Sequence, residues 1–102
     1  MEIKIFDQAL EGFLTALGEK ELAKALRTID LLETFGNKLG MPHARKISAD
    51  IFELRVRGKR EIRIFYTFHK RQVVLLSGFI KKTDKTPAGE IRVANKKRLT
   101  LI

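Results

Sequence analysis

Two runs of alternating residues in the second half of the chain constrain its fold most. At residues 51–57 and 60–69 every second residue is apolar, and most of the residues between them are polar or charged. Successive side chains of a strand point to opposite faces, so each run predicts a strand with one apolar and one basic face. The segments Arg57–Arg60 and His69–Gln72 have lengths suited to hairpin turns. The pattern therefore predicts three consecutive antiparallel strands, the last over 73–80.

The third of these strands is apolar on both faces over Val73–Leu76. This composition is typical of a strand that helices cover on one side and partly cover on the other. Near the N-terminus, residues 2–6 alternate weakly and predict a further short strand.

Two apolar stripes at helical spacing predict a pair of helices before these strands. Asp7 is placed to cap the first helix and Gly18 to end it. The second helix is expected over about 19–35, with a stop at Gly36. The stripes consist of Leu10, Phe13, Leu14 and Leu17 in the first helix, and of Leu22, Leu26, Ile29 and Leu32 in the second. We interpret the charged residues on their outer faces as a solvated surface rather than a binding site.

A third helix is predicted at the C-terminal end of the chain. Thr86 and Pro87 read as a cap followed by a first-turn proline, and the helix is expected to continue to about Arg98. Ile91 and Ala94 are expected to face inward. Together the elements predict an α+β fold in which an N-terminal helix hairpin packs on an antiparallel β-sheet.

The size and composition narrow the class of protein. With 102 residues, of which 44% are hydrophobic, we expect one domain over residues 1–102. The absence of cysteine excludes a disulfide framework and a thiolate zinc site. No metal-binding or nucleotide-binding motif is present, so no metal or cofactor is expected. No apolar run approaches the ~20 residues of a membrane helix and no signal peptide is recognisable, so we expect a cytoplasmic protein with no membrane partner.

Positive charge is concentrated in the second half of the chain. The net charge is +9, yet residues 1–40 have five basic and seven acidic side chains, and residues 41–54 have two of each. Residues 55–80 have seven basic side chains against one acidic, and residues 81–102 have seven against two. This asymmetry indicates a polyanionic partner, either nucleic acid or an acidic protein. Net charge alone leaves open that the protein is merely basic.

A basic candidate site is predicted on the non-core face of the strands. Arg55 and Arg63 are expected to share that face, with Arg60 nearby as an RNA-binding residue, and Lys81, Lys82 and Lys85 at one end of it. Guanidinium groups match phosphate oxygens, and aromatic rings can stack on unpaired bases. We therefore add Phe65 and Phe79 as RNA-binding residues; the alternative is that both are ordinary core residues. His43 and His69 are the only histidines, and we interpret both as solvated.

Four segments of the chain form a recognisable series. They are Gly40-Met41-Pro42, Phe52-Glu53-Leu54-Arg55, Arg63-Ile64-Phe65-Tyr66, and the long block from Leu76 to Ile91, which contains Gly78-Phe79-Ile80-Lys81-Lys82-Thr83 and Lys85-Thr86-Pro87. In these segments the chain resembles the RelE/HigB toxins of bacterial toxin–antitoxin pairs, especially their phage-derived branch. The resemblance spans nearly the whole chain.

The resemblance implies a RelE-like fold and an endoribonuclease that cuts mRNA, usually on the ribosome, by attack of the 2′-hydroxyl on the adjacent phosphate. It implies that Arg63 acts at the scissile phosphate, that Lys82 and Lys85 are further basic catalytic groups, and that Arg55 is a nearby basic position. Either lysine could be the general base. The best-studied members have a C-terminal tyrosine that this chain lacks; Glu90 and Ile91 stand near the corresponding position. The implied protein partner is a small antitoxin, of helix-turn-helix type.

Two other functions are compatible with the same residues. The basic face could hold RNA or the ribosome without cutting, or the chain could be a phage-associated domain that docks an acidic protein. Comparison of intact and cleaved message after induced expression separates the first alternative from a toxin. Protein binding that survives nuclease treatment would favour the second.

Overall fold

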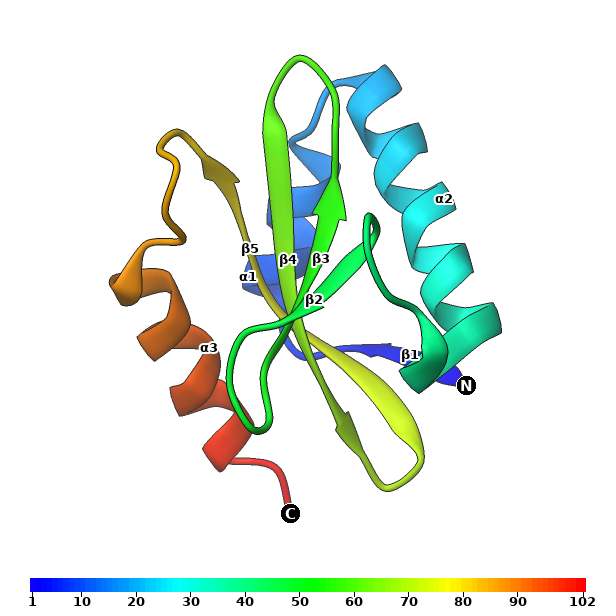
Figure 1. Cartoon of the computed structure of the whole chain (residues 1–102), viewed down its shortest axis with the longest axis vertical. Coiled ribbons are helices and arrows are strands. Elements are labelled where there is room, and N and C mark those ends of the chain that lie inside the picture. The colour runs from blue at the N-terminus through cyan, green and yellow to red at the C-terminus, as the bar shows by residue number, and fades with distance from the viewer.

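The structure of the protein is a computed structural model that describes residues 1–102. One five-stranded sheet lies between helices, with α1 and α2 on one face and α3 on the other (Figure 1). The elements in chain order are β1 (Glu2–Ile5), α1 (Gln8–Thr15), α2 (Glu19–Phe35), the 3₁₀ turn η1 (Gly36–Lys38), β2 (Ala44–Lys46), β3 (Phe52–Val56), β4 (Glu61–His69), β5 (Gln72–Lys81) and α3 (Ala88–Leu99).

The predicted α+β fold is confirmed, including three consecutive antiparallel strands and the two hairpins that join them. The strand order is β1-β5-β4-β3-β2. The sheet is mixed rather than purely antiparallel, because β1 pairs in parallel with β5. The short edge strand β2 was not predicted, since three residues are too few to show an alternating pattern.

The hairpin between β4 and β5 has a two-residue loop of unusual composition. Lys70 and Arg71 both have positive φ angles, 50° and 63°. Positive φ at both central residues is typical of the type I′ turn, whose twist matches the twist of the flanking strands. Asparagine and glycine usually occupy such positions. Here two basic residues adopt the conformation instead.

Two apolar cores lie on the two faces of the sheet. The larger packs α1 and α2 against the sheet through residues such as Leu10, Leu32 and Tyr66. The smaller packs α3 against the other face and contains Ile51, Phe65, Val74, Leu76, Phe79 and Ala94. This arrangement explains why the sequence of β5 is apolar on both faces. It also confirms the inward orientation of Ala94, beside which Ile91 is partly buried.

Close packing of α1 on β5 depends on one glycine. A Cβ atom at Gly78 would lie 2.6 Å from Cδ2 of Phe13 and 3.3 Å from Cδ1 of Leu10. Real Cβ atoms essentially never lie within 3.0 Å of a non-bonded neighbouring atom. A side chain at this position would therefore push the helix away from the sheet.

Helix starts were predicted with mixed success. Oδ1 of Asp7 accepts the backbone N–H of Leu10 at 3.0 Å, as a helix cap should. The predicted cap of α3 is wrong, because Pro87 occupies the N-cap position and the helix begins at Ala88. The hydroxyl of Thr86 is directed elsewhere, to the carboxylate of Glu53. None of the three helices has the length and apolarity that crossing a membrane requires.

Candidate functional site

The register of the sheet places the two predicted arginines side by side. Arg55 on β3 is the direct partner of Arg63 on β4, and Arg63 is in turn the partner of Phe79 on β5. Directly paired residues of adjacent strands point to the same face. Both arginines therefore share one face, as predicted, but the expectation that this face has no core is wrong, because α3 packs on part of it.

A buried carboxylate organises this face. Glu53 is fully buried, and three elements converge on it. Nη2 of Arg45, on β2, lies 3.3 Å from Oε1 of Glu53, and Nε of Arg63 lies 3.7 Å from the same oxygen. The hydroxyl of Thr86 donates to Oε2 at 3.0 Å. Because a buried carboxylate is stable only with close donors and cations, these contacts tie β2, β4 and the β5–α3 loop to β3.

Arg63 is turned into this network rather than toward solvent. Its Nη2 lies 3.1 Å from Oε1 of Glu61, and its Nη1 donates to the backbone oxygen of Ile62 at 3.2 Å. Only 1% of Arg63 is exposed. The hydrogen bond from Arg63 is the main cause that holds the pKa of Glu61 below its usual value. The expectation that Arg63 presents its charge on a basic non-core face is corrected: two carboxylates neutralise it and the surrounding chain covers it.

Arg55 is the contrasting member of the pair. It forms no ion pair with a carboxylate; its Nη1 donates only to Sδ of Met41, at 3.4 Å. Its Nε is buried and has no hydrogen-bond partner. Burial lowers the pKa of Arg55, and the charges of Arg63 and Arg57 lower it further. The carboxylate of Glu53 opposes this shift through space but makes no ion pair with Arg55. A partly desolvated cation with cationic neighbours and no directly paired carboxylate is a favourable place for an anion.

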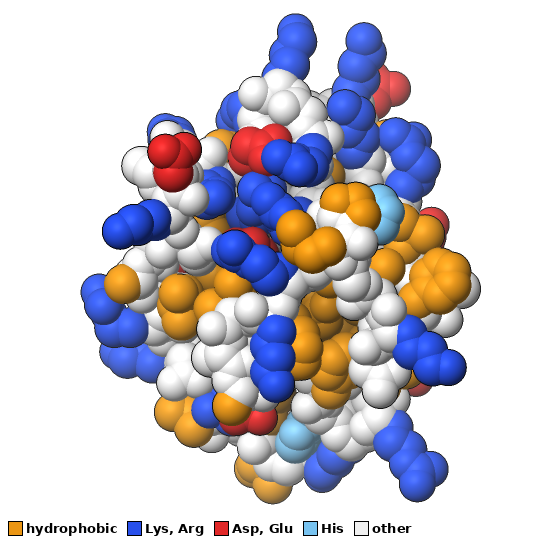
Figure 2. All heavy atoms as spheres, viewed as in Figure 1, with side chains coloured by type: hydrophobic (Ala, Val, Ile, Leu, Met, Phe, Trp, Pro, Cys, Tyr) orange, Lys and Arg blue, Asp and Glu red, His pale blue; other side chains and the backbone are white.

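The three predicted lysines extend the basic surface at the end of β5. Lys81 pairs in register with Glu61, whereas Lys82 and Lys85 are exposed in the loop that leads to α3. Lys85 lines an open hollow of about 430 Å³ together with Arg45, Lys46 and Thr86, among others. Figure 2 shows Lys and Arg side chains gathered over the upper half of the molecule, where Figure 1 draws the β3–β4 hairpin and the β5–α3 loop.

Three predicted RNA-binding residues do not join this surface. Phe65 is fully buried and Phe79 is 7% exposed, because α3 covers the rows of the sheet that contain them. Their rings pack on each other, with centroids 5.3 Å apart, so the expectation of open stacking surfaces is corrected in favour of core packing. Arg60 is bound to Glu21 of α2 by two hydrogen bonds, at 2.6 and 2.8 Å, on the helix-hairpin side. This partner raises the pKa of Arg60 and removes its guanidinium from the predicted group.

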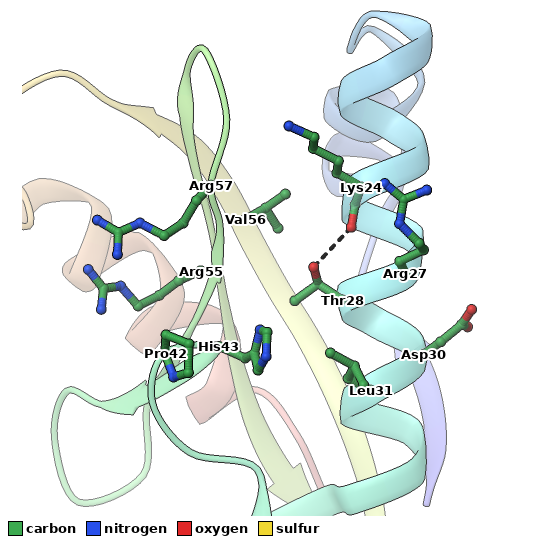
Figure 3. A pocket seen from close by; sticks show the side chains of 10 residues that line it. All are labelled: Lys24, Arg27, Thr28, Asp30, Leu31, Pro42, His43, Arg55, Val56 and Arg57. Atoms are coloured by element: carbon green, nitrogen blue, oxygen red, sulfur yellow. Dashed lines mark hydrogen bonds between the residues drawn. The ribbon is translucent and has the colours of Figure 1, made fainter.

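A cleft of about 540 Å³ separates α2 from the edge of the sheet at β3 (Figure 3). Lys24 and Arg27 project from α2, while Arg55 and Arg57 project from β3. The full lining is Lys24, Arg27, Thr28, Asp30, Leu31, Pro42, His43, Arg55, Val56 and Arg57. Lys24 and Arg27 belong to a helix face that the sequence pattern predicts to be solvated, so they were not among the predicted site residues. Both residues line the cleft because this face of α2 lies beside β3. Their place in the site depends on how the helix packs on the sheet, which the sequence does not show.

The two histidines occupy different surroundings. His43 is exposed and lines the cleft beside Arg55, and its backbone oxygen accepts the N–H of Arg55 at 2.8 Å. His69 lies near the C-terminus, where Nε2 is 2.8 Å from the backbone oxygen of Ile102. His43 is therefore the histidine that shares a surface with the unpaired arginine. No group of three or more potential metal-ligating side chains occurs in the structure.

Comparison with known proteins gives one match. The model of a family described as "Phage derived protein Gp49-like (DUF891)" matches residues 12–99, which include α2, the whole β3–β5 meander and α3. No match is found among the curated proteins. The matched range contains every residue of the candidate site.

Proposed function

Because the chain belongs to the Gp49-like family of phage-derived proteins, we propose that it is the toxin of a toxin–antitoxin pair, a metal-independent endoribonuclease that cuts mRNA on the ribosome. The observation that carries the proposal is the state of Arg55. It is a partly buried cation without a carboxylate partner, at the centre of a basic surface. A phosphodiester supplies the negative charge that this position lacks.

The proposed reaction needs little from the protein, because RNA carries its own nucleophile. The 2′-oxygen attacks the adjacent phosphorus, a bond from phosphorus to O2′ forms, and the bond to O5′ of the next nucleotide breaks. A base takes the proton of the 2′-hydroxyl, and an acid returns a proton to O5′. The protein aligns these atoms and stabilises the extra negative charge on the phosphate.

Roles follow from accessibility. Arg55 is the group that contacts the scissile phosphate, and the exposed Lys82 and Lys85 are the catalytic groups that move protons or neutralise charge beside it. Arg63 is a positioning residue: it holds the carboxylates of Glu53 and Glu61, and its charge adds positive potential at Arg55 without touching the RNA.

Protein and ribosome partners belong to the same proposal. A toxin with a net charge of +9 gains affinity and association rate from an acidic antitoxin. The ribosome presents rRNA phosphates that the basic surface can contact in the same way. If an adjacent gene encodes a small helix-turn-helix protein, co-purification of the two proteins tests the proposed antitoxin.

The decisive experiment compares two arginine variants after induced expression in bacteria. RNA ends are mapped for the wild type, for Arg55→Gln and for the control Arg71→Gln, which removes the same charge at the opposite end of β4. We expect new message ends with the wild type and the control, and a loss of about 10²–10³-fold in cleavage with Arg55→Gln. Full cleavage by Arg55→Gln would reject the assignment of Arg55.

The same experiment separates the alternative functions. Message that is bound to the induced protein but uncut would identify an RNA- or ribosome-binding module without catalysis. Undamaged message together with a nuclease-resistant protein complex would identify a protein-interaction domain. Either result would reject the endoribonuclease.

A further inference from the structure

The cleft between α2 and β3 is not explained by a reaction centre at Arg55 and the β5–α3 loop. We propose that it is a second phosphate-binding subsite, into which the RNA strand continues from Arg55 toward Lys24 and Arg27. The inference rests on the proposed function, because it assigns the path of the same RNA. The subsite adds Lys24 and Arg27, from the first half of the chain, to a site whose predicted residues all lie in the second half.

The geometry of the sheet edge makes this path continuous. β2 pairs with β3 only from Phe52 to Leu54. The last contact between them is the hydrogen bond from the N–H of Arg55 to the oxygen of His43. Beyond it, no strand flanks β3 on this side, so a ligand can pass from the basic face around the edge into the cleft. Figure 3 shows Arg55 and Arg57 pointing away from α2, while Val56 between them points toward it.

The charges of the cleft favour an anion. Lys24 and Arg27 form no ion pair with a carboxylate, and neither does Arg55. Arg57 has one such contact, with Glu61 at 3.5 Å, and both side chains of that pair are partly exposed. Asp30 is the only acidic residue of the lining. Four cations against one carboxylate leave the cleft strongly positive, which favours a chain of phosphates.

The charged side chains of the lining favour RNA over an acidic protein segment as the occupant. The hydroxyl of Thr28 already donates to the backbone oxygen of Lys24 at 2.9 Å, so recognition depends on the cations themselves. Leu31 and Pro42 also line the cleft, whereas Val56 is buried. Arginine forks and a mobile lysine suit successive phosphates. The cleft also shares Arg55 and Arg57 with the basic face, which gives one strand contacts on both sides of the edge.

The salt dependence of RNA binding tests this subsite. Affinity for a labelled single-stranded RNA is measured at several salt concentrations for the wild type, for Lys24→Gln/Arg27→Gln, and for Lys70→Gln/Arg71→Gln. The control pair removes the same charge from the β4–β5 turn at the other end of the sheet. Each lost phosphate contact lowers the slope of log affinity against log salt by about 0.7 for a single strand. We expect the cleft variant to lose about 1.4 from the slope, and the control to keep it.

Several outcomes overturn the subsite. Equal slopes for the cleft and control variants would show that only overall charge matters. A cleft variant that keeps RNA affinity but loses affinity for poly-glutamate would identify an acidic protein segment as the occupant. In both cases weakened RNA binding by Arg55→Gln would leave the proposed function standing. Failure of the wild type to bind or cut RNA at all would reject the proposed function itself. Circular dichroism of each variant verifies that it is folded.

Discussion

The hydroxyl of Thr86 donates a hydrogen bond to the buried carboxylate of Glu53 at 3.0 Å, across 33 positions of sequence. Thr86 ends the loop that contains Lys82 and Lys85, and Glu53 lies in the middle of β3. Arg45 strengthens the contact, since its Nη2 is within 3.4 Å of the Thr86 hydroxyl and 3.3 Å of Glu53. The bond therefore holds the basic loop against the sheet at the point where Arg45 and Arg63 approach the same carboxylate.

Replacement of Thr86 by valine should release this loop. Valine has nearly the same shape but cannot donate, so Glu53 loses one hydrogen bond, and a hydrogen bond to a charged group is worth about 1.5–3 kcal/mol. We expect trypsin to cut the folded Thr86→Val protein after Lys82 or Lys85 about tenfold faster than the wild type, or more. Thr86→Ser keeps the donor and should behave as the wild type does. Equal cutting of the valine and serine variants would show that the hydrogen bond does not hold the loop.

Replacement of Glu53 by glutamine should destabilise the whole protein. The change leaves Arg63 buried with only Glu61 to neutralise it, and removal of one member of a buried ion pair costs about 3–5 kcal/mol. Because Glu61 remains, we expect a loss at the lower end of this range in the free energy of unfolding, measured with urea. The matched variant Glu61→Gln removes a partly exposed carboxylate and should cost clearly less.

The sequence was sufficient to predict most elements of the fold, because each of these has a local cause. The alternation over Glu61–His69 reflects a strand whose two faces lie in different environments. The cap at Asp7 depends on a hydrogen bond to Leu10, only three positions along the chain. The parallel pairing of Glu2–Ile5 with β5 was not predictable in this way, since it depends on a partner about seventy residues away.

The candidate site was predictable only to the level of a shared face. The pleat places Arg55, Arg63, Phe65 and Phe79 together, but it does not show which rows of that face the third helix covers. Burial of the two rings and of Arg63 follows from that tertiary contact, and for Arg63 also from the carboxylates of Glu53 on β3 and Glu61 on β4 itself. The approach of α2 to β3, which creates the cleft, likewise depends on how a helix packs across a sheet rather than on any local pattern.

Acid should weaken the contact between the N-terminal and C-terminal helices. Oδ2 of Asp7 lies 2.9 Å from Nζ of Lys97, and this hydrogen bond is the main cause that lowers the pKa of Asp7 below 3.8. A lowered folded pKa gives stability that is present above 3.8 and is lost as the pH falls through the folded value. Asp7→Asn preserves a cap and removes the charge. We expect the difference in unfolding free energy between wild type and Asp7→Asn to shrink as the pH is lowered, measured by denaturant titration at each pH.

A constant difference between the two proteins from neutral pH to below pH 3.8 would show that the ion pair does not contribute to stability. Lys97→Met provides the reciprocal control. It removes the cation from the same pair, and it also ends the donation from Nζ of Lys97 to the backbone oxygen of Leu76. Its stability should lose the same acid dependence, with an additional loss that does not vary with pH.

Alkali should unfold the protein before it ionises the single tyrosine in the folded state. Tyr66 is 1% exposed in the larger core, and burial raises its pKa from 10.0 to about 12. A phenol whose folded pKa is raised contributes full stability below pH 10.0 and loses it as the pH rises toward the folded value, because the unfolded chain ionises more readily. The chain has one tyrosine and no tryptophan, so phenolate absorbance reports on this residue alone.

As the pH is raised, we expect phenolate absorbance to appear together with the loss of helical circular dichroism. Phenolate formation near pH 10 with the helices intact would show that the ring is open to solvent. Tyr66→Phe should remove the alkaline loss of stability attributable to the phenol, since the phenylalanine ring fills the same space without an ionisable group.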